Sequence, residues 1–328
     1  MNYRTLGKTD YTVSEVGFGA WAIGGSWGEV KDDDALNALR EAISQGVTFL
    51  DTADVYGDGR SEKLIAQVLD DYQGDRIYVA TKAGRRLDPH VTSGYNYANL
   101  EKFVKRSLEN LKTDTLDLVQ LHCPPTDVYR RDTAFEALER LKSEGALRHY
   151  GVSVETVEEA NLAIEHEGVA TVQIIYNMFR FKPALEFFDA AKKNNVGIIC
   201  RVPLASGLLS GKMSKDRDFA EDDHRNFNRD GEAFDVGETF SGVDFETGVE
   251  AADELKSIVP EGHTLAQTAL RWILMHSAVS TVIPGAKNPK QARENAQASD
   301  LEPLPPSAMQ RVRELYDEKI REQVHDRW

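Results

Sequence analysis

VTFLDTADVYG, residues 47–57, is an apolar run of strand length that ends abruptly in an acidic residue, Asp51. The short polar loop behind Asp51 carries a phenol, Tyr56. Buried parallel strands are near-continuous apolar runs, and the reactive groups of closed α/β folds lie where such strands end. The stretch therefore predicts a parallel α/β fold with Asp51 and Tyr56 at its mouth.

Two later apolar runs end in the same way. RIYVAT, residues 76–81, leads into Lys82, and LDLVQL, residues 116–121, leads into His122. Because neighbouring parallel strands present their carboxyl ends at one edge, Lys82 and His122 are expected beside Asp51. Each side chain alone has an ordinary structural explanation, but their occurrence on three successive strand ends favours an active site.

Apolar runs of strand length alternate with segments of helical periodicity through most of the chain. Eight strands separated in this way within roughly 300 residues favour an α/β fold, a closed (β/α)8 TIM barrel, over an open sheet. A β-hairpin over residues 3–14 is expected before the barrel, and a C-terminal helix over residues 307–323 after it. Residues 210–245 are polar and aperiodic, which predicts a functional loop. Residues 1–328 are therefore expected to form a single barrel domain.

Local signals predict where some elements begin. Residues 16–23 are expected to form the first barrel strand, the acids at 32–34 to cap a helix, and Ser61 to cap the next. GFGAWA, residues 17–22, also satisfies the loose dinucleotide-binding pattern G-x-G-x-x-A. That pattern requires a helix to start within it, whereas residues 24–28 are expected to continue as a loop. A doubly wound dehydrogenase is therefore disfavoured.

Composition disfavours several classes of partner. A net charge of −15 opposes large anionic partners such as nucleic acid and acidic membranes, because like charges repel. The first residues lack the apolar core of a signal peptide, and no apolar run reaches the length of a membrane span. Only two cysteines occur, Cys123 and Cys200, so no disulfide framework is implied. We expect a reduced, soluble, cytoplasmic protein.

Six short motifs, taken in chain order, resemble those of the aldo-keto reductase superfamily. They are DTADVYG (51–57), TK (81–82), LH (121–122), GVS (151–153), PLASGLLSGK (203–212) and IPGAK (283–287). Each motif alone is weak evidence, whereas six in the right order on the expected elements are highly specific. The resemblance covers residues 3–295 and is strongest toward bacterial reductases and the potassium-channel β-subunit-like branch.

The resemblance implies roles for four residues at the barrel mouth. Tyr56 would be the general acid, Lys82 and Asp51 its charged partners, and His122 the residue that orients the substrate carbonyl. A phenol titrates near pH ~10 and is a poor proton donor at neutral pH. A buried ammonium favours phenolate and is expected to lower the pKa of Tyr56, while Asp51 keeps that ammonium from being buried alone. This chemistry requires no metal, and no cluster at ligand spacing is evident in the sequence.

The resemblance also implies a nicotinamide cofactor, and it favours NADP(H) over NAD(H). Ser153 and Gln173 would hold the carboxamide, and Lys287 is well placed for a ribose 2′-phosphate. The other residues that match cofactor-binding positions are Trp21, Asp51, Arg201, Val202, Leu204, Ser206, Gly207, Lys212, Gly285, Ala286, Gln291, Glu294 and Asn295.

The chain departs from the family pattern at two positions. Val154 stands where the family often has Asn, which removes one hydrogen bond to the carboxamide. Arg201 stands where many members have a Tyr that stacks on the nicotinamide, and a guanidinium can stack or reach the pyrophosphate instead. Because an unpaired charge after an apolar strand is costly, Arg201 requires a ligand or an acidic partner. Trp21 and Trp27 are candidates for the substrate pocket, and Trp328 either folds over the mouth or extends away.

Three functions remain open at this point. The first is reduction of aldehydes or ketones to alcohols with NADP(H), and the reverse, by a monomer or weak homo-oligomer acting on a small carbonyl or alcohol. The second is a cofactor-sensing binding subunit with little turnover. The third is an aldolase or isomerase that forms a Schiff base at Lys82, which the pairing of Lys82 with an acid and a phenol disfavours. The substrate itself is not predicted, because its walls come from loops such as residues 179–181 and 210–245.

Overall fold

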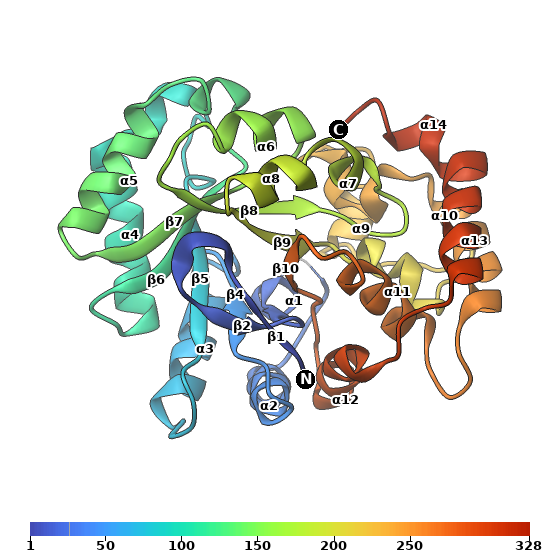
Figure 1. Ribbon diagram of the computed structural model, residues 1–328. Coiled ribbons are helices and arrows are strands. Elements are labelled where there is room, and N and C mark those ends of the chain that lie inside the picture. The colour runs from blue at the N-terminus through green and yellow to red at the C-terminus, as the bar shows by residue number, and fades with distance from the viewer. Residues whose placement is uncertain (26) are drawn as a thin grey trace.

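The computed structural model describes residues 1–25 and 27–328, and its centre is a parallel sheet of eight strands (Figure 1). Each strand pairs with the next one along the chain. The strands are β3 (Phe18–Gly19), β4 (Phe49–Asp51), β5 (Tyr78–Ala83), β6 (Leu116–His122), β7 (Leu147–Ser153), β8 (Val169–Ile175), β9 (Gly197–Arg201) and β10 (Val279–Val282). Parallel bridges from Val16 to Val282 and from Gly19 to Gly285 join the two ends of the sheet. The (β/α)8 barrel that the sequence predicts is therefore confirmed.

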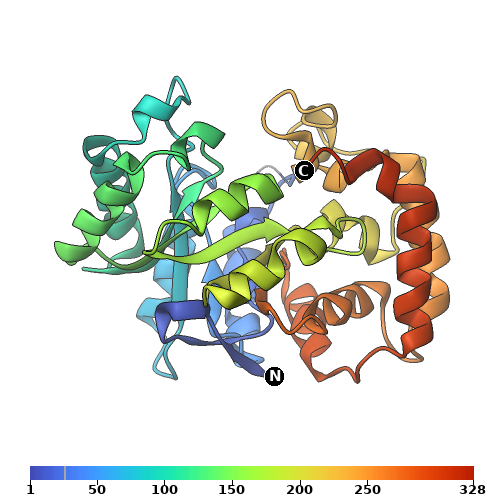
Figure 2. The ribbon, with the colours of Figure 1, turned by 45° about the horizontal axis from the view of Figure 1, so that its top comes forward.

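Helices wrap the outside of this barrel (Figures 1 and 2). Those that follow successive strands are α2 (Asp32–Ser44), α3 (Arg60–Asp70), α4 (Tyr97–Leu111), α5 (Thr133–Ser143), α6 (Val157–Ala163), α7 (Lys182–Glu186), α8 (Phe188–Lys193), α11 (Leu265–Leu274) and α12 (Pro289–Ala296). In α4, Leu100, Phe103 and Val104 recur at helical spacing and are buried, and the side chain of Asn96 caps the amino end. Among the described residues, no helix has both the length and the apolar character needed to span a membrane.

A β-hairpin closes the amino end of the barrel, as the sequence predicts. Its strands are β1 (Tyr3–Thr5) and β2 (Thr12–Ser14), which pair antiparallel. Gly7, between them, has a φ of 55°, and a Cβ at this position would lie 2.2 Å from the backbone nitrogen of Gly197 in β9. Only glycine allows this approach, which lets Leu6 bury itself completely against the barrel interior. Access to the barrel is therefore left to the carboxyl ends of the strands.

Residues 210–245 lie over the carboxyl end of the barrel and hold little regular structure, as expected. The described part includes one short α-helix, α9 (His224–Phe227), among several single 3-10 turns. An isolated bridge between Trp27 and Asp223 ties this excursion to the loop after the first strand. Regular structure resumes with α10 (Phe245–Leu255).

The predicted C-terminal helix is present but is interrupted by a π-helical turn. α13 (Pro306–Leu315) runs into a π-helical turn, Tyr316–Ile320, and then into α14 (Arg321–Val324). Trp328 then folds back over the excursion, and its Nε1 donates to Oδ1 of Asp235 at 2.8 Å. Figure 1 and Figure 2 both place this end of the chain beside the excursion.

The predicted extent of the first strand is wrong. β3 comprises only Phe18–Gly19, because α1 (Trp21–Gly24) turns the chain directly after it. This single helical turn starts inside the G-x-G-x-x-A pattern but ends within four residues. It is too short to serve as the helix of a dinucleotide-binding unit.

Two predicted helix caps are also wrong. The N-cap of α2 is Lys31, and Asp32 instead makes a 2.5 Å ion pair with Arg60 of α3. The N-cap of α3 is Gly59, whose φ of 90° suits a residue without a side chain. Ser61 lies inside α3, where its hydroxyl donates to a backbone carbonyl oxygen.

Candidate active site

An acid, an amine and a phenol meet at the carboxyl ends of β4 and β5. Nζ of Lys82 lies 2.5 Å from Oδ1 of Asp51, 2.9 Å from the carbonyl oxygen of Thr52 and 3.3 Å from the hydroxyl of Tyr56. Asp51 and Lys82 are 2% and 1% exposed, so the pair is sealed from water. The three groups that the sequence places at neighbouring strand ends are therefore in direct contact.

The loop after β4 is held by its closing glycine. Gly57 has a φ of 60°, and a Cβ there would lie 2.0 Å from the carbonyl oxygen of Gly24 in α1. Any other residue would push the loop away from α1. The sharp turn at Gly57 thus keeps Tyr56 over the Lys82 ammonium, whose Nζ is 5.0 Å from the phenol ring centroid.

Two buried amides complete the environment of Asp51. Oδ2 of Asp51 accepts a hydrogen bond from Nε2 of Gln173 at 2.6 Å and another from Nε2 of Gln120 at 3.3 Å. Gln173 is expected to contact the cofactor, whereas Gln120 is not predicted from the sequence. In the sequence, Gln120 stands out only as a polar residue inside the apolar run of β6, two positions before His122. These donors fix the carboxylate and satisfy the oxygen that Lys82 does not use.

The pKa of Tyr56 differs from the expectation. Burial raises this pKa above its ordinary value, and the charge and hydrogen bond of Lys82 lower it without offsetting burial. Desolvation of the phenolate outweighs the attraction of the ammonium, because Asp51 already neutralises that ammonium. Burial lowers the pKa of Lys82, but the charges and hydrogen bonds of Asp51 and Tyr56 together raise it more, so the net pKa is raised. The site thus holds a protonated phenol beside a charged ammonium.

His122 faces Tyr56 from the end of β6. Their ring centroids are 5.9 Å apart and the rings meet edge to face. Burial lowers the pKa of His122 well below its ordinary value, and the charges of Arg85 and Lys82 lower it further. The imidazole is therefore neutral near pH ~7 and carries one N–H donor.

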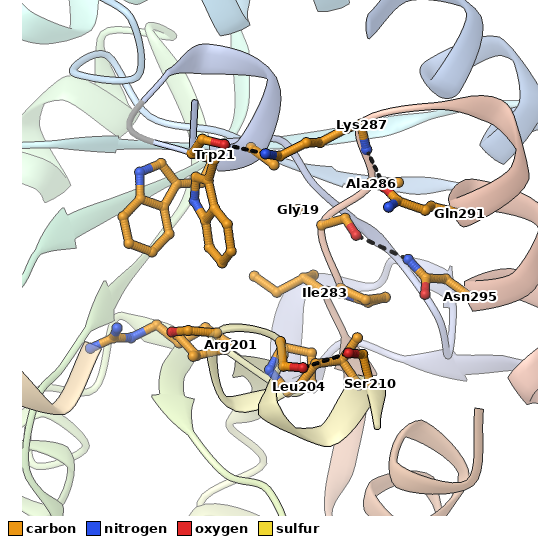
Figure 3. Close-up of a pocket in the computed structure, with 18 of the residues that line it drawn as sticks. Gly19, Trp21, Arg201, Leu204, Ser210, Ile283, Ala286, Lys287, Gln291 and Asn295 are labelled. Carbon is orange, nitrogen blue, oxygen red and sulfur yellow. Dashed lines mark hydrogen bonds between the residues drawn. The ribbon is translucent and has the colours of Figure 1, made fainter. Parts of the chain in front are cut away.

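A cavity of about 530 Å³ opens above these residues (Figure 3). Asp51, Tyr56 and His122 line it, and Lys82 lies behind them. The predicted cofactor-binding residues all line the same cavity: Trp21, Asp51, Ser153, Gln173, Arg201, Val202, Leu204, Ser206, Gly207, Lys212, Gly285, Ala286, Lys287, Gln291, Glu294 and Asn295. In Figure 3 Trp21 lies toward one end and Gln291 and Asn295 toward the other, and the side chain of Lys287 runs from the latter to the carbonyl oxygen of Trp27. The cavity is therefore elongated, with the catalytic candidates toward the indole end.

Four cationic side chains, three from the excursion and one from the loop before α12, also line the cavity. They are Lys212, Arg217, Arg225 and Lys287. Nζ of Lys287 donates to the carbonyl oxygen of Trp27, and burial lowers the pKa of Lys287, as does the nearby charge of Arg225. Arg217 and Arg225 are not predicted as site residues from the sequence. Their only signal is their place in the charged excursion that is expected to be functional.

Arg201 points at acids and away from the phosphate end. Its Nη2 donates to Oε2 of Glu155 at 2.8 Å and to the carbonyl oxygen of Val154 at 2.9 Å. Its Nη1 lies 3.6 Å from Oε1 of Glu238. The guanidinium of Arg201 is thus held by these acids, and its stacking on a nicotinamide or reach to a pyrophosphate stays a prediction. The alternative, an acidic partner for the charge, is what the structure contains.

Three of the described acidic or thiol groups do lie at metal-ligand spacing, which the sequence does not predict. They are Cys123, Glu155 and Glu238. Both carboxylates are already ion-paired with Arg85 and Arg201. A cation would have to displace both guanidiniums, so the donor set does not suit a metal.

Aromatic rings form the wall of the cavity beside the phenol. The ring of Trp21 is stacked over that of Tyr56 at 6.2 Å, and the ring of Trp27 meets Trp21 edge to face at 5.3 Å. Phe234, from the excursion, contacts Trp21 at 5.9 Å. Trp21 and Trp27 line the cavity beside the phenol, as the sequence analysis proposes.

A closed (β/α)8 barrel with a buried acid, amine and phenol at its carboxyl end defines the class, and comparison with known proteins gives the family. The model of the aldo/keto reductase family matches residues 15–317, so the chain belongs to this family and is an oxidoreductase. It is 31% identical over 307 residues to the uncharacterized oxidoreductase YqkF of Bacillus subtilis, covering 93% of each chain. It is 30% identical over 334 residues to a probable voltage-gated potassium channel subunit beta of Arabidopsis thaliana, covering 97% of this chain and 98% of that one. The solved structure of the glycerol dehydrogenase AKR11B4 from Gluconobacter oxydans is similar, with a TM-score of 0.79, 27% identity and coverage of 97% and 96%.

Proposed function

We propose that the protein interconverts aldehydes or ketones and alcohols with NADP(H), and that Tyr56 is its general acid. One observation carries this proposal: Lys82 Nζ lies 2.5 Å from Asp51 and 3.3 Å from the hydroxyl of Tyr56 at the wall of the cavity. Family membership supports oxidoreductase chemistry. Both cysteines are free and buried, which supports a cytoplasmic location.

The cavity fits a dinucleotide. At its catalytic end, Ser153 and Gln173 offer a hydroxyl and an amide carbonyl for a carboxamide. Lys212, Arg217 and Lys287 make no ion pair in the described part of the chain and supply three cations, more than the two backbone phosphates of a dinucleotide require, whereas Arg225 is paired with Asp223 at 2.6 Å. A third phosphate, on the ribose, accounts for this excess and favours NADP(H) over NAD(H).

A reduced nicotinamide cofactor, when bound, supplies a hydride to the carbonyl carbon of the substrate. Tyr56 donates its proton to the carbonyl oxygen as negative charge develops there. Lys82 stabilises the phenolate that this transfer leaves, and Asp51 keeps Lys82 charged. His122, as a neutral imidazole, donates its N–H to the same oxygen and sets its position. In the alcohol-oxidising direction the phenolate takes the proton back.

Consumption of NADPH with a reactive aldehyde, 4-nitrobenzaldehyde, tests this proposal. Turnover that falls at least about a hundredfold in the Lys82→Met variant, while NADPH still quenches tryptophan fluorescence, supports it. Equal turnover in the variant rules out the assigned roles. Lys63→Met, at an exposed position of α3, is the matched control.

A second candidate is a cofactor-sensing binding subunit. It is favoured by the likeness to the plant protein named as a probable potassium channel subunit beta. Such a protein would bind NADPH tightly with negligible turnover across aldehydes, ketones and sugars. The buried Lys82–Asp51 pair beside Tyr56 favours the enzyme, because a sensor needs no charged ammonium next to a phenol.

A further inference from the structure

One guanidinium brackets the loop that carries the proposed general acid. Nη1 of Arg106, in α4, donates to the carbonyl oxygen of Asp54 at 3.0 Å, and its Nη2 donates to the carbonyl oxygen of Asp58 at 2.8 Å. These two carbonyls lie two residues before and two residues after Tyr56. Nη2 of Arg106 also donates to the carboxylate of Asp58 at 2.6 Å. A single side chain from a neighbouring helix therefore ties the two sides of this loop together.

The helix that supplies this guanidinium is also tied to the strand that carries the ammonium. One turn further along α4, Nδ2 of Asn110 donates to Oε2 of Glu62 at 2.8 Å. Oε1 of Glu62 accepts from the hydroxyl of Thr81 at 2.6 Å, and all three side chains are buried. Thr81 directly precedes Lys82 in β5. Because α4 contacts both the strand and the loop, it sets the position of the phenol relative to the ammonium.

The loop keeps a backbone conformation that its surroundings must impose. Asp58 has a φ of 54°, in the left-handed region that favours glycine. Residues held there cost free energy and persist only where neighbouring contacts over-determine them. Arg106 supplies two of these contacts, since it donates to both the carbonyl oxygen and the carboxylate of Asp58. Without the guanidinium, the loop is expected to relax away from this conformation.

The contact that this loop maintains tolerates little displacement. Nζ of Lys82 lies 3.3 Å from the hydroxyl of Tyr56, near the upper limit for an N–H···O hydrogen bond. The proposed mechanism needs this contact, because Lys82 stabilises the phenolate that forms when Tyr56 gives up its proton. A shift of the loop by about 1 Å would break it, and a misplacement of that size can slow a reaction by about a hundredfold.

We infer that Arg106 is a positioning residue for the proposed reaction, whose guanidinium holds the loop so that the hydroxyl of Tyr56 stays in contact with Lys82. This inference rests on the proposed function, because it requires Tyr56 to be the proton donor. The role depends on the fork shape of the guanidinium and not on its charge alone. An ammonium on a flexible stem has no rigid fork with which to span two carbonyls, so a lysine does not replace Arg106.

The test measures the rate constant of single-turnover hydride transfer from NADPH to 4-nitrobenzaldehyde, because this constant does not depend on the fraction of protein that is folded. Arg106→Ala and Arg106→Lys should each transfer hydride at least about tenfold more slowly, while their affinity for NADPH changes less than about twofold. The side chain of Arg106 is 29% exposed, so a small cation can reach the space that Arg106→Ala vacates. Guanidinium ion at millimolar concentration should therefore raise the rate of Arg106→Ala at least about threefold.

Arg86→Ala is the matched control. Arg86 is 31% exposed, and its Nη1 donates to the same Asp58 carboxylate at 2.6 Å. In the described part of the chain it donates to neither of the two loop carbonyls. The control thus removes an equal charge beside Asp58 without releasing the loop backbone. It should transfer hydride within about twofold of the wild-type rate, since a solvent-exposed ion pair contributes little.

The outcomes separate this inference from the proposed function. A rate close to that of the wild-type protein in Arg106→Ala or in Arg106→Lys overturns the positioning role and leaves Tyr56 as the proton donor. An equal loss of rate in Arg86→Ala, or a loss in Arg106→Ala that guanidinium does not relieve, overturns the role as well. Where Arg106→Ala does not fold, Arg106→Lys decides, because it keeps the charge. Absence of hydride transfer by the wild-type protein overturns the proposed function itself.

Discussion

Lys82 Nζ and Asp51 Oδ1 lie 2.5 Å apart, and both side chains are almost completely buried. The pair comes from adjacent strands, β4 and β5, and nothing but the strand register brings its members together. Removing one partner of a buried pair leaves an uncompensated charge, which typically costs about 3–5 kcal/mol. The pair therefore supports the role of Tyr56, but the loss of either charged partner would destabilise the fold.

The first prediction concerns the stability lost when one partner of the Lys82–Asp51 pair is removed. Lys82→Met strands the Asp51 carboxylate, so the free energy of unfolding should fall by about 3 kcal/mol in denaturant titrations. The double variant Lys82→Met/Asp51→Leu removes both charges and should recover at least half of that loss. A double variant as unstable as the single one would show that packing rather than charge sets the cost.

The second prediction concerns cofactor choice. Lys287→Met should lower the ratio of kcat/KM for NADPH to that for NADH by roughly tenfold to a hundredfold, about 1.4–2.7 kcal/mol. Lys290→Met changes an 80% exposed side chain in α12, three residues after Lys287, and should leave the ratio unaltered. An unchanged ratio for Lys287→Met would assign the 2′-phosphate to the other cations.

The third prediction uses the low pKa of His122. The folded state keeps this imidazole neutral, whereas the unfolded state takes up a proton below pH ~6.5. Stability from this residue is therefore lost as the pH falls below pH ~6.5, with a slope of up to about 1.4 kcal/mol per pH unit. His122→Asn should flatten the decline in unfolding free energy toward pH ~5. His263→Asn, at an exposed site, should not.

The fourth prediction concerns Asp54, in the loop that carries Tyr56. Asp54 is fully buried and makes no ion pair in the described part of the chain, and burial, followed by the charge of Glu62, raises its pKa to about 7. Its folded pKa lies above the unfolded one, so its contribution to stability falls as the pH rises from ~4 to ~7. The difference between 3.8 and about 7 corresponds to at most about 4 kcal/mol.

Asp54→Asn removes this cost. The variant should therefore be more stable than the wild-type protein near pH ~8 and similar to it near pH ~4. Urea titrations at both pH values measure the difference. Asp71→Asn, at an exposed end of α3, should show no such dependence, and a destabilised Asp54→Asn at pH ~8 would mean that the carboxylate has a stabilising partner.

The elements that follow hydrophobic periodicity could be predicted from the sequence. The apolar runs that end at Asp51 and His122 locate β4 and β6, and parallel pairing then requires their ends to meet. Contacts made across the excursion could not be predicted, because no periodic pattern relates Glu238 to Arg85 or to Arg201. The direction of the pKa shift of Tyr56 could not be predicted from the sequence either, because it depends on how deeply the phenol is buried.

Chemical roles at the site depend most on Tyr56. The direct measurement is single-turnover transfer of hydride from NADPH to 4-nitrobenzaldehyde by the Tyr56→Phe variant, with NADPH affinity followed in parallel. The variant should bind NADPH as the wild-type protein does and transfer hydride at least about a thousandfold more slowly, because Tyr56 supplies the hydroxyl that contacts Lys82. Transfer within about threefold of the wild-type rate would contradict a proton donated by Tyr56.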